Sequence, residues 1–556
     1  MPLKFIVFFA CLICSAFLQA QDLEGIGKKK PFEISGSISA FADGYFVNGI
    51  EPRSTPFNWR LNGSPTITVY GISLPFYFNV GSQGRSFTQP FNQYGVSPKY
   101  KWVTAHLGWR NLTYSQYTLS GISFFGAGIE LNPGKFRFAA MYGRFNRAIR
   151  LDTIPQQFVT PEPVYERRGF STRIGFGTAT NFLDFIFFKA QDDSSSYQNA
   201  PYKIKPAENA IFGISSRLLL FKHLQIHFDG ALSGYTRDLR LDSLSDESLK
   251  RLDFILKTNA SSQLLFAGNT SIGYVSKYFG LKFQYKRVDQ DYKSMGSYQY
   301  HTDLEAITIE PSLNLFKSKI RLSGSIGQQK DNLSRSKMIA TSRTIGSVNL
   351  SLNPSRKYGL DIQYGNYGVT QRSGIIPLND TIRMAIANQN VNLINRFTSI
   401  NKSRALTIVL LNTYQEMTNL NPLFPAFIES KVIIGNLNIN YTLIKTGVNF
   451  SGGYNYSRSM FSQGIIELSG PMIGFGKNML KNKMNLSLSG GFQSSRFNGN
   501  SNGITINSGL NLNYRISKKN NFTLNFRLIK NTSNNPVSVP FTEGFISAGY
   551  QYTLGK

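Results

Sequence analysis

Eight basic side chains recur at alternating positions in apolar-patterned segments along the chain. Side chains of a strand alternate between two faces, so the residues between the apolar positions share one polar face. The eight are Arg137, Arg173, Arg217, Lys282, Lys286, Arg321, Arg515 and Arg527. Fewer acidic residues, chiefly Asp229 and Asp361, fall in the same register. Because fixed cations in a water-filled pore attract anions and repel cations, the pattern predicts a basic lumen.

A second interpretation of these cations stays open. They could form ion pairs with acidic residues of loops that fold inward, or only solvate the wall. The face is also inferred one strand at a time, and a slip of one residue would invert it.

Residues for catalysis or metal binding are sparse. The histidines are His106, His223, His227 and His301, and no third ligand stands at metal spacing. His223 and His227 would share a helical face, but they bracket a turn and a strand position. No Gly-x-Ser-x-Gly, phosphate-binding glycine loop or His-Glu-x-x-His motif is present, and no local motif indicates a Ser/His or Asp/His set. We therefore expect no enzyme activity, no cofactor and no metal.

The first residues predict export. The run from Phe5 to Leu18 has the length and apolar character of a signal-peptide core, and it ends before Ala20. Cleavage between Ala20 and Gln21 would remove both cysteines of the sequence, which excludes disulfides and cysteine-based chemistry. The expected organisation is a signal peptide over 1–20, a short periplasmic segment over 21–31 and one barrel over 32–556.

The elements that would position the polar face are clearest at the C-terminal end. Apolar residues occupy nearly every second position from Ile504 to Ile516, from Phe522 to Leu528 and from Ile546 to Leu554. A period of two is typical of strands with one apolar and one polar face. The same alternation recurs back to Phe32 without a linker, which predicts a single all-β domain.

Short turns and long polar connections alternate along the chain, as in outer-membrane barrels with short periplasmic turns and long extracellular loops. The expected fold is a transmembrane antiparallel up-and-down β-barrel of about 24 strands, within a range of roughly 20 to 26. One of these strands is the weakly patterned segment from Asn388 to Ile400. The loop from Asp238 to Lys257 is expected to form a short amphipathic helix.

The region from Thr66 to Tyr100 is less regular. Thr66 to Val80 is read as one strand, in which Pro75 indicates an edge, a bulge or a break. Gly81 to Tyr100 is too irregular for a strand and too apolar for a free loop, so we expect it to fold against the wall or into the lumen.

The formal net charge of +29 over 556 residues needs a partner of opposite charge. Nucleic acid is the usual partner of a basic chain, but the export signal and the alternating strands argue against it. A basic pore or a surface facing lipopolysaccharide explains the charge better. Aromatic residues gather towards strand ends, as in interfacial girdles, and few fall in the lumenal register, which disfavours a saccharide channel.

The last strand carries the most specific resemblance. Ser547, Gly549, Tyr552 and Leu554 follow the polar-x-Gly-x-x-hydrophobic-x-hydrophobic order of the β-signal read by barrel-assembly machinery, without its common terminal Phe. In architecture and in this signal the chain resembles porin-like bacterial outer-membrane β-barrel proteins. The resemblance implies the Gram-negative outer membrane, contacts with its lipid and lipopolysaccharide, and periplasmic chaperones and assembly machinery during biogenesis.

The resemblance also implies passive or loop-gated passage of small solutes. Our first hypothesis is such a channel with a modest preference for anions. The second is a non-conducting barrel that acts as a scaffold or as the membrane component of a secretion or surface-assembly complex, with another envelope protein as partner. A TonB-dependent transporter is disfavoured because the mature chain is too short for its strands and a folded plug, and an enzyme on a barrel ranks last.

Overall fold

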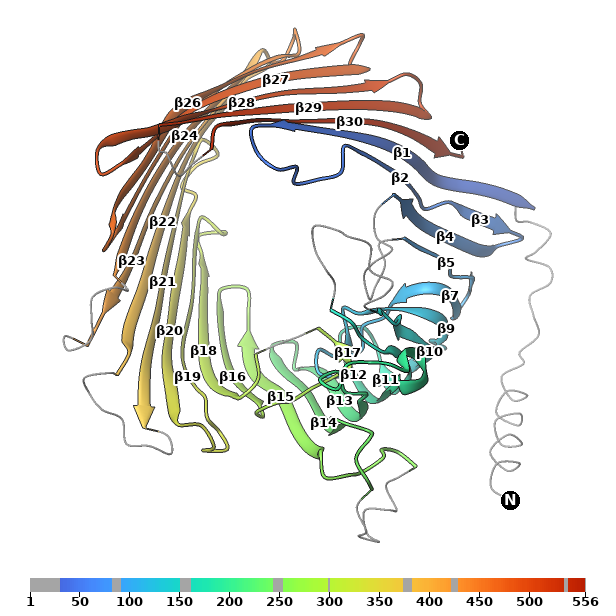
Figure 1. Cartoon of the computed structure of the whole chain (residues 1–556). Helices are drawn as coiled ribbons and strands as arrows, with labels where there is room; N and C mark the ends of the chain where they lie inside the picture. The colour runs from blue at the N-terminus through green and yellow to red at the C-terminus, as the bar shows by residue number, and fades with distance from the viewer. Residues whose placement is uncertain are drawn as a thin grey trace.

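The computed structural model describes residues 31–82, 92–150, 162–243, 254–298, 301–373, 383–421, 429–534 and 539–555. Its wall begins with β1 (Phe32–Asn48) and ends with β30 (Phe541–Leu554), which pair antiparallel from Gly36 opposite Leu554 to Asn48 opposite Thr542. The first and last strands therefore close the sheet into a barrel, with the blue β1 beside the red β30 in Figure 1. Closure leaves the sheet without a free edge.

Within the described residues the sheet contains 28 strands, each antiparallel to its neighbours. At two places in the wall, two short strands together occupy one position between the same two neighbouring strands. β2 (Phe57–Gly63) and β3 (Thr66–Val69) both lie between β1 and β4 (Ile72–Gly81). β5 (Gln93–Val96) and β6 (Lys99–Tyr100) both lie between β4 and β7 (Val103–Asn111). The barrel thus has 26 strand positions. The predicted all-β antiparallel barrel is confirmed, and the strand number lies at the top of the expected range.

The other strands of the first half of the wall are β9 (Ser123–Leu131), β10 (Phe136–Asn146), β11 (Glu166–Gly177), β12 (Phe182–Asp193), β13 (Glu208–Leu220), β14 (Leu224–Thr236), β15 (Ser262–Val275), β16 (Phe279–Val288), β18 (Leu304–Leu315) and β19 (Ile320–Lys330). Those of the second half are β20 (Ile339–Leu352), β21 (Tyr358–Ser373), β22 (Ala385–Ile400), β23 (Arg404–Asn419), β24 (Ser430–Leu443), β25 (Val448–Phe461), β26 (Gly464–Met479), β27 (Met484–Phe497), β28 (Asn500–Arg515) and β29 (Asn520–Ser533). The interpretation of Asn388 to Ile400 as a strand is confirmed by β22.

The difference between the expected number of about 24 strands and the 26 strand positions of the structure arises near the N-terminal end of the wall. The segment read as one strand from Thr66 to Val80 is the hairpin of β3 and β4, and the segment expected to be irregular contributes β5 and β6 to the wall. Pro75 lies within the continuous strand β4. The wall is interrupted in the two neighbouring positions instead, between β2 and β3 on one side and between β5 and β6 on the other. Phe76 N donates to Pro65 O at 2.8 Å, and Ser97 N donates to Pro75 O at 3.0 Å. Because proline has no N–H, Pro65 between β2 and β3 and Pro98 between β5 and β6 donate no ladder hydrogen bond at these two breaks.

The two faces of each strand differ as the alternation predicts. On β28, Ile504, Ile506, Leu510 and Leu512 share one face, and Thr505, Asn507, Asn511 and Asn513 share the other. The apolar face carries exposed side chains around the barrel, such as Ile506, Leu488 of β27 and Phe283 of β16. The opposite face is the one against which chain segments pack inside the barrel.

Two connections fold inward and cover one part of the inner wall. Residues 112–122 and 289–298, here called the inner loop pair, meet in a parallel pairing of β8 (Leu119–Ser120) with β17 (Gly296–Ser297). β17 lies inside the ring of strands in Figure 1. Tyr117, Leu119 and Met295 of the loop pair pack against inner residues of β9 to β16, including Phe124 and Ile211. This cluster is the apolar core of the described chain.

Helices contribute little to the described residues. They contain one 3-10 helix, Ser194–Tyr197, whose first turn is capped by the Asp193 side chain accepting from Ser195 N. In these same ranges, no helix has the length and apolar character needed to cross a membrane. The amphipathic helix expected between Asp238 and Lys257 falls largely in 244–253, outside the described residues.

Candidate functional site

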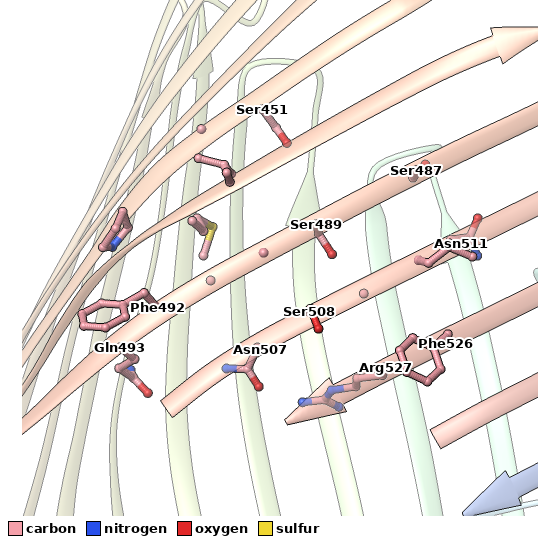
Figure 2. Close-up of a pocket in the computed structure, with 18 of the residues that line it drawn as sticks. Ser451, Ser487, Ser489, Phe492, Gln493, Asn507, Ser508, Asn511, Phe526 and Arg527 are labelled. Carbon is pink, nitrogen blue, oxygen red and sulfur yellow. The ribbon is translucent and has the colours of Figure 1, made fainter. Parts of the chain in front are cut away.

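The polar wall of β24 to β30 forms a groove of about 570 Å³. Figure 2 shows Gln493, Asn507, Asn511 and Arg527 from β27, β28 and β29 along it. Its amide-bearing residues are Asn438, Asn440, Asn455, Gln493, Asn507, Asn511 and Asn525. An amide both donates and accepts hydrogen bonds, so these side chains can hydrate or bind polar solutes.

The groove owes its depth to small residues at neighbouring positions. Ser489, Gly509 and Gly491 line it where larger side chains would fill it. Asn511 Nδ2 donates to Asn525 Oδ1 on the adjacent strand. Arg527 lies directly across from Phe545 of β30, so a cation and an aromatic ring stand side by side in the groove.

Three of the eight predicted lumenal cations form ion pairs. Arg137 Nη2 lies 3.0 Å from Asp184 Oδ2, and Lys282 Nζ lies 2.9 Å from Glu310 Oε2. Arg173 Nη2 lies 3.8 Å from Glu130 Oε2. Their acidic partners come from strands of the wall, not from inward-folded loops. The cations without an ion pair within the described residues are Arg217, Lys286, Arg321, Arg515 and Arg527.

The sequence interpretation missed these acidic partners. Glu130 lies between Ile129 and Leu131, and Glu310 lies in the alternating run of β18, so the same period of two could have placed both. Of the acidic residues that were identified, Asp361 lies 3.8 Å from Arg396, and Asp229 accepts from Ser115 Oγ at 2.5 Å. The wall is therefore less basic than the count of cations indicates.

A buried polar chain lines the inner face beside the proline-broken strands. His106 Nδ1 lies 2.8 Å from Ser97 Oγ, and His106 Nε2 lies 2.9 Å from Glu130 Oε1. In serine hydrolases Nε2 faces the serine and Nδ1 faces the carboxylate, which is the opposite order. Ser97 and His106 are both buried. The arrangement fixes the imidazole between two strands and does not present Ser97 as a nucleophile.

The remaining histidines bring no metal site together. His223 Nδ1 lies 3.0 Å from Val275 O in the turn before β14, and His227 lies in the strand opposite Arg217. Among the described residues, no group of three or more His, Cys, Asp or Glu side chains could hold a metal ion.

The four residues of the predicted assembly signal lie in the seam that closes the barrel. Leu554 pairs with Gly36 and Tyr552 with Ile38 of β1. Ser547 Oγ donates to Asp43 Oδ1 at 2.5 Å, and a Cβ on Gly549 would lie 2.6 Å from the Phe41 ring. The segment thus contacts the first strand along its length, while its role as a signal stays a prediction. The predicted cleavage site, Ala20 and Gln21, lies outside the described residues.

Comparison with known proteins finds similar solved structures but no family. No family model and no curated protein matches the sequence. Among solved structures, OccAB4 of Acinetobacter baumannii is 13% identical, with 67% of this chain and 97% of that chain covered and a TM-score of 0.29. The FrpB iron transporter of Neisseria meningitidis (F5-1 variant) is 10% identical, with 94% and 82% covered and a TM-score of 0.39.

A further similar structure is OccK1 of Pseudomonas aeruginosa, which is 11% identical, with 63% of this chain and 93% of that chain covered and a TM-score of 0.30. These solved structures are outer-membrane β-barrel proteins, and the likeness of the chain to them concerns the barrel architecture alone. At these TM-scores no particular family is assigned.

Proposed function

We propose that the chain is a channel of the Gram-negative outer membrane through which small solutes pass by passive or loop-gated diffusion. The observation that carries the proposal is the closed barrel itself, whose outer face is apolar and whose inner face bears the amide-lined groove of β24 to β30. A closed barrel satisfies its backbone hydrogen bonds within the wall, which is the requirement for strands in lipid. Lipid and lipopolysaccharide would contact the outer face, and we assign no catalytic step to the chain.

The connections support an orientation in the membrane. One rim of the barrel carries short connections, such as 132–135 and 516–519, and also both ends of the wall. The other rim carries long connections, such as 147–165 and 237–261. In outer-membrane barrels the short turns are periplasmic and the long loops extracellular. We place the rim of short turns in the periplasm, with chaperones and barrel-assembly machinery acting on the chain before insertion.

A modest preference for anions is part of this proposal. It rests on the five inner cations without an ion pair, because paired cations contribute little net potential. Arg515 and Arg527 are the most informative of these, since Arg527 lines the groove and Arg515 lies at the end of the neighbouring strand.

Conductance of the purified protein in a planar bilayer under a KCl gradient tests both parts. We expect open-channel steps with a reversal potential on the anion-selective side. Arg515→Ser with Arg527→Ser should reduce the anion-to-cation permeability ratio about twofold, because two lumenal charges are lost. Lys481→Ser with Lys518→Ser, an equal loss of charge in exposed turns, should leave the ratio unchanged. Absence of steps would reject the channel, and a cation-selective reversal would reject the anion preference alone.

The inner loop pair favours a second candidate function. It covers the inner wall of β9 to β16 with buried contacts, so part of the barrel interior is filled. A non-conducting barrel that serves as a scaffold or as the membrane component of a secretion or surface-assembly complex, with another envelope protein, would have such a filled interior. Recovery of a stoichiometric envelope protein with a barrel that never conducts would favour this candidate.

A further inference from the structure

A second cavity, of about 530 Å³, lies where the end of β14 meets the inner loop pair. Its walls carry Tyr235 and Arg237 from the β14 side, and Asp291, Lys293 and Tyr298 from residues 289–298 of the inner loop pair. Pockets for small ligands have this order of volume. None of these side chains belongs to the eight basic residues that the sequence singled out.

Among the described residues, the cationic groups that line this cavity or act on it from beside it outnumber the carboxylates that can neutralise them. Arg167 of β11 forms an ion pair with Asp192, in which Nε donates to Oδ1 at 2.7 Å and Nη2 donates to Oδ2 at 3.2 Å. The acidic partner of Arg237 among the described residues is the exposed Asp291, at 4.0 Å. Lys293 has no ion pair within the described residues. The Arg167–Asp192 pair is a two-point contact, so Asp192 is not free to turn towards Lys293.

Lys293 is held rigidly although its ammonium group lacks an acidic partner. Its backbone carbonyl accepts from Ser233 Oγ at 2.7 Å, and the next residue, Ser294, donates to Thr118 O at 2.5 Å. The side chain itself is exposed to the cavity. Partial burial lowers the pKa of Lys293, and the guanidinium groups of Arg167 and Arg237 lower it further against the opposing effect of Asp192. Because Lys293 and Arg237 both line the cavity, an anion bound there would stabilise the charged form of Lys293.

Tyrosine rings supply the remaining contact surface. Tyr235 is half-buried and packs against the apolar core, and Tyr298 is 61% exposed. Tyr292, between Asp291 and Lys293, is buried and donates its hydroxyl to Tyr117 O at 2.8 Å. Aromatic faces bind the flat or apolar face of a ring, whereas a small inorganic anion gains nothing from them.

From this geometry we propose that the cavity is a binding site for a small organic anion, in which a carboxylate or phosphate contacts Lys293 and Arg237 and an attached sugar or aromatic ring lies against Tyr235 and Tyr298. The site deepens the proposed channel function, because it names a solute class, but binding does not require conduction. A scaffold barrel could bind the same ligand, so a negative conductance experiment would reject the channel and leave the binding site untouched, and a negative binding experiment would do the reverse.

Isothermal titration calorimetry on the full chain folded in detergent micelles tests the site. The probes are glucose 6-phosphate and benzoate, with inorganic phosphate and acetate as ringless anions and glucose as the uncharged ring. We expect saturable binding of at least one ring-bearing anion, weaker binding of its ringless counterpart and none of glucose. Tighter binding of glucose 6-phosphate identifies a phosphate site, and tighter binding of benzoate a carboxylate site.

Substitutions then locate the binding. Lys293→Gln should weaken it about tenfold, the typical loss for one charge-assisted contact. Lys518→Gln removes an equal charge from an exposed turn and should change nothing. Asp291→Asn removes the carboxylate that competes for Arg237 and should tighten binding, a gain that misfolding cannot produce. The proposal is overturned if no ring-bearing anion binds, if phosphate or acetate binds as tightly as its ring-bearing counterpart, or if Lys518→Gln weakens binding as much as Lys293→Gln.

Discussion

His106 Nε2 lies 2.9 Å from Glu130 Oε1 on the inner face of the barrel, and Glu130 Oε2 reaches Arg173 at 3.8 Å. Arg173 in turn lies over the Tyr114 ring, with 5.0 Å between the guanidinium carbon and the ring centroid. Glu130 therefore joins β7, β9 and β11 to the inner loop pair. A single carboxylate in this position couples the wall to the segment that fills the interior.

The first prediction concerns that carboxylate. Glu130→Ala leaves His106 and Arg173 without their acidic partner on a largely buried face, and should lower the free energy of unfolding by about 2 kcal/mol. Urea unfolding of the protein folded in lipid vesicles, followed by tryptophan fluorescence, measures the loss. Glu310→Ala, which breaks the more exposed pair with Lys282, is the matched control and should cost less than about 1 kcal/mol. Equal losses in the two variants would contradict the assigned role of Glu130.

The second prediction concerns the wall beside the prolines. β5 meets β7 only through Gly95 opposite Gly108 and Val96 opposite Leu107, and β6 meets β4 only through Lys99 opposite Ser73. Strands with so few ladder bonds open locally at low cost. Hydrogen exchange followed by mass spectrometry should therefore show β5 and β6 exchanging faster than β1 and β30. Protection of β5 equal to that of the closing pair would refute a weak seam.

The same strands show where sequence reasoning reached its limit. A period of two predicted β28 to β30 because each strand runs for many residues with one apolar face. β5 and β6 are too short for a period, and the intervening Ser97–Pro98 reads as a turn. They are strands only because β4 and β7 pair with them on both sides. Tertiary pairing decided the structure of this segment.

The functional residues divide in a similar way. Alternation gave a register for Arg137 and Arg173 but no partner. Asp184 and Glu130 lie far away in the sequence, and each meets its arginine across one intervening strand of the wall. Lys293 lies in a loop without periodic sequence, so no sequence pattern predicts its position. The loop is fixed to the wall by a long-range contact, in which Asn209 Oδ1 accepts a hydrogen bond from Met295 N.

The third prediction concerns two glycines that face each other across β9 and β10. Gly126 lies opposite Gly143, and a Cβ on Gly126 would meet the backbone carbonyl of Tyr142 and the Gly143 Cα. Backbone cannot move aside easily, so Gly126→Ala should destabilise the barrel by about 1–3 kcal/mol. Gly490→Ala is the control, since nothing lies within 4 Å of the added Cβ. Thermal unfolding followed by circular dichroism should separate the two variants, and equal midpoints would show that this close approach is not required.

The last prediction concerns the anchor of the inner loop pair. Asn209 is fully buried, and besides its bond to Met295 N at 3.0 Å it donates to Ser233 Oγ at 2.8 Å. Asn209→Ala leaves the Met295 amide without its acceptor and should release residues 289–298 from the wall. We expect faster hydrogen exchange in that segment and, if the barrel conducts, a larger and noisier single-channel conductance.

Asn525→Ala is the control for that anchor. It removes an asparagine from the amide-lined wall of β29, where Asn525 Oδ1 accepts a hydrogen bond from Asn511 of the adjacent strand and not from a loop. Exchange in 289–298 should then match the unmodified protein. If Asn209→Ala also leaves exchange and conductance unchanged, the loop pair is held by its apolar contacts to Phe124 and Ile211 rather than by this hydrogen bond. Faster exchange without any change in conductance would instead place the loop pair away from the conducting path, because a segment that narrows the path cannot loosen without altering the current.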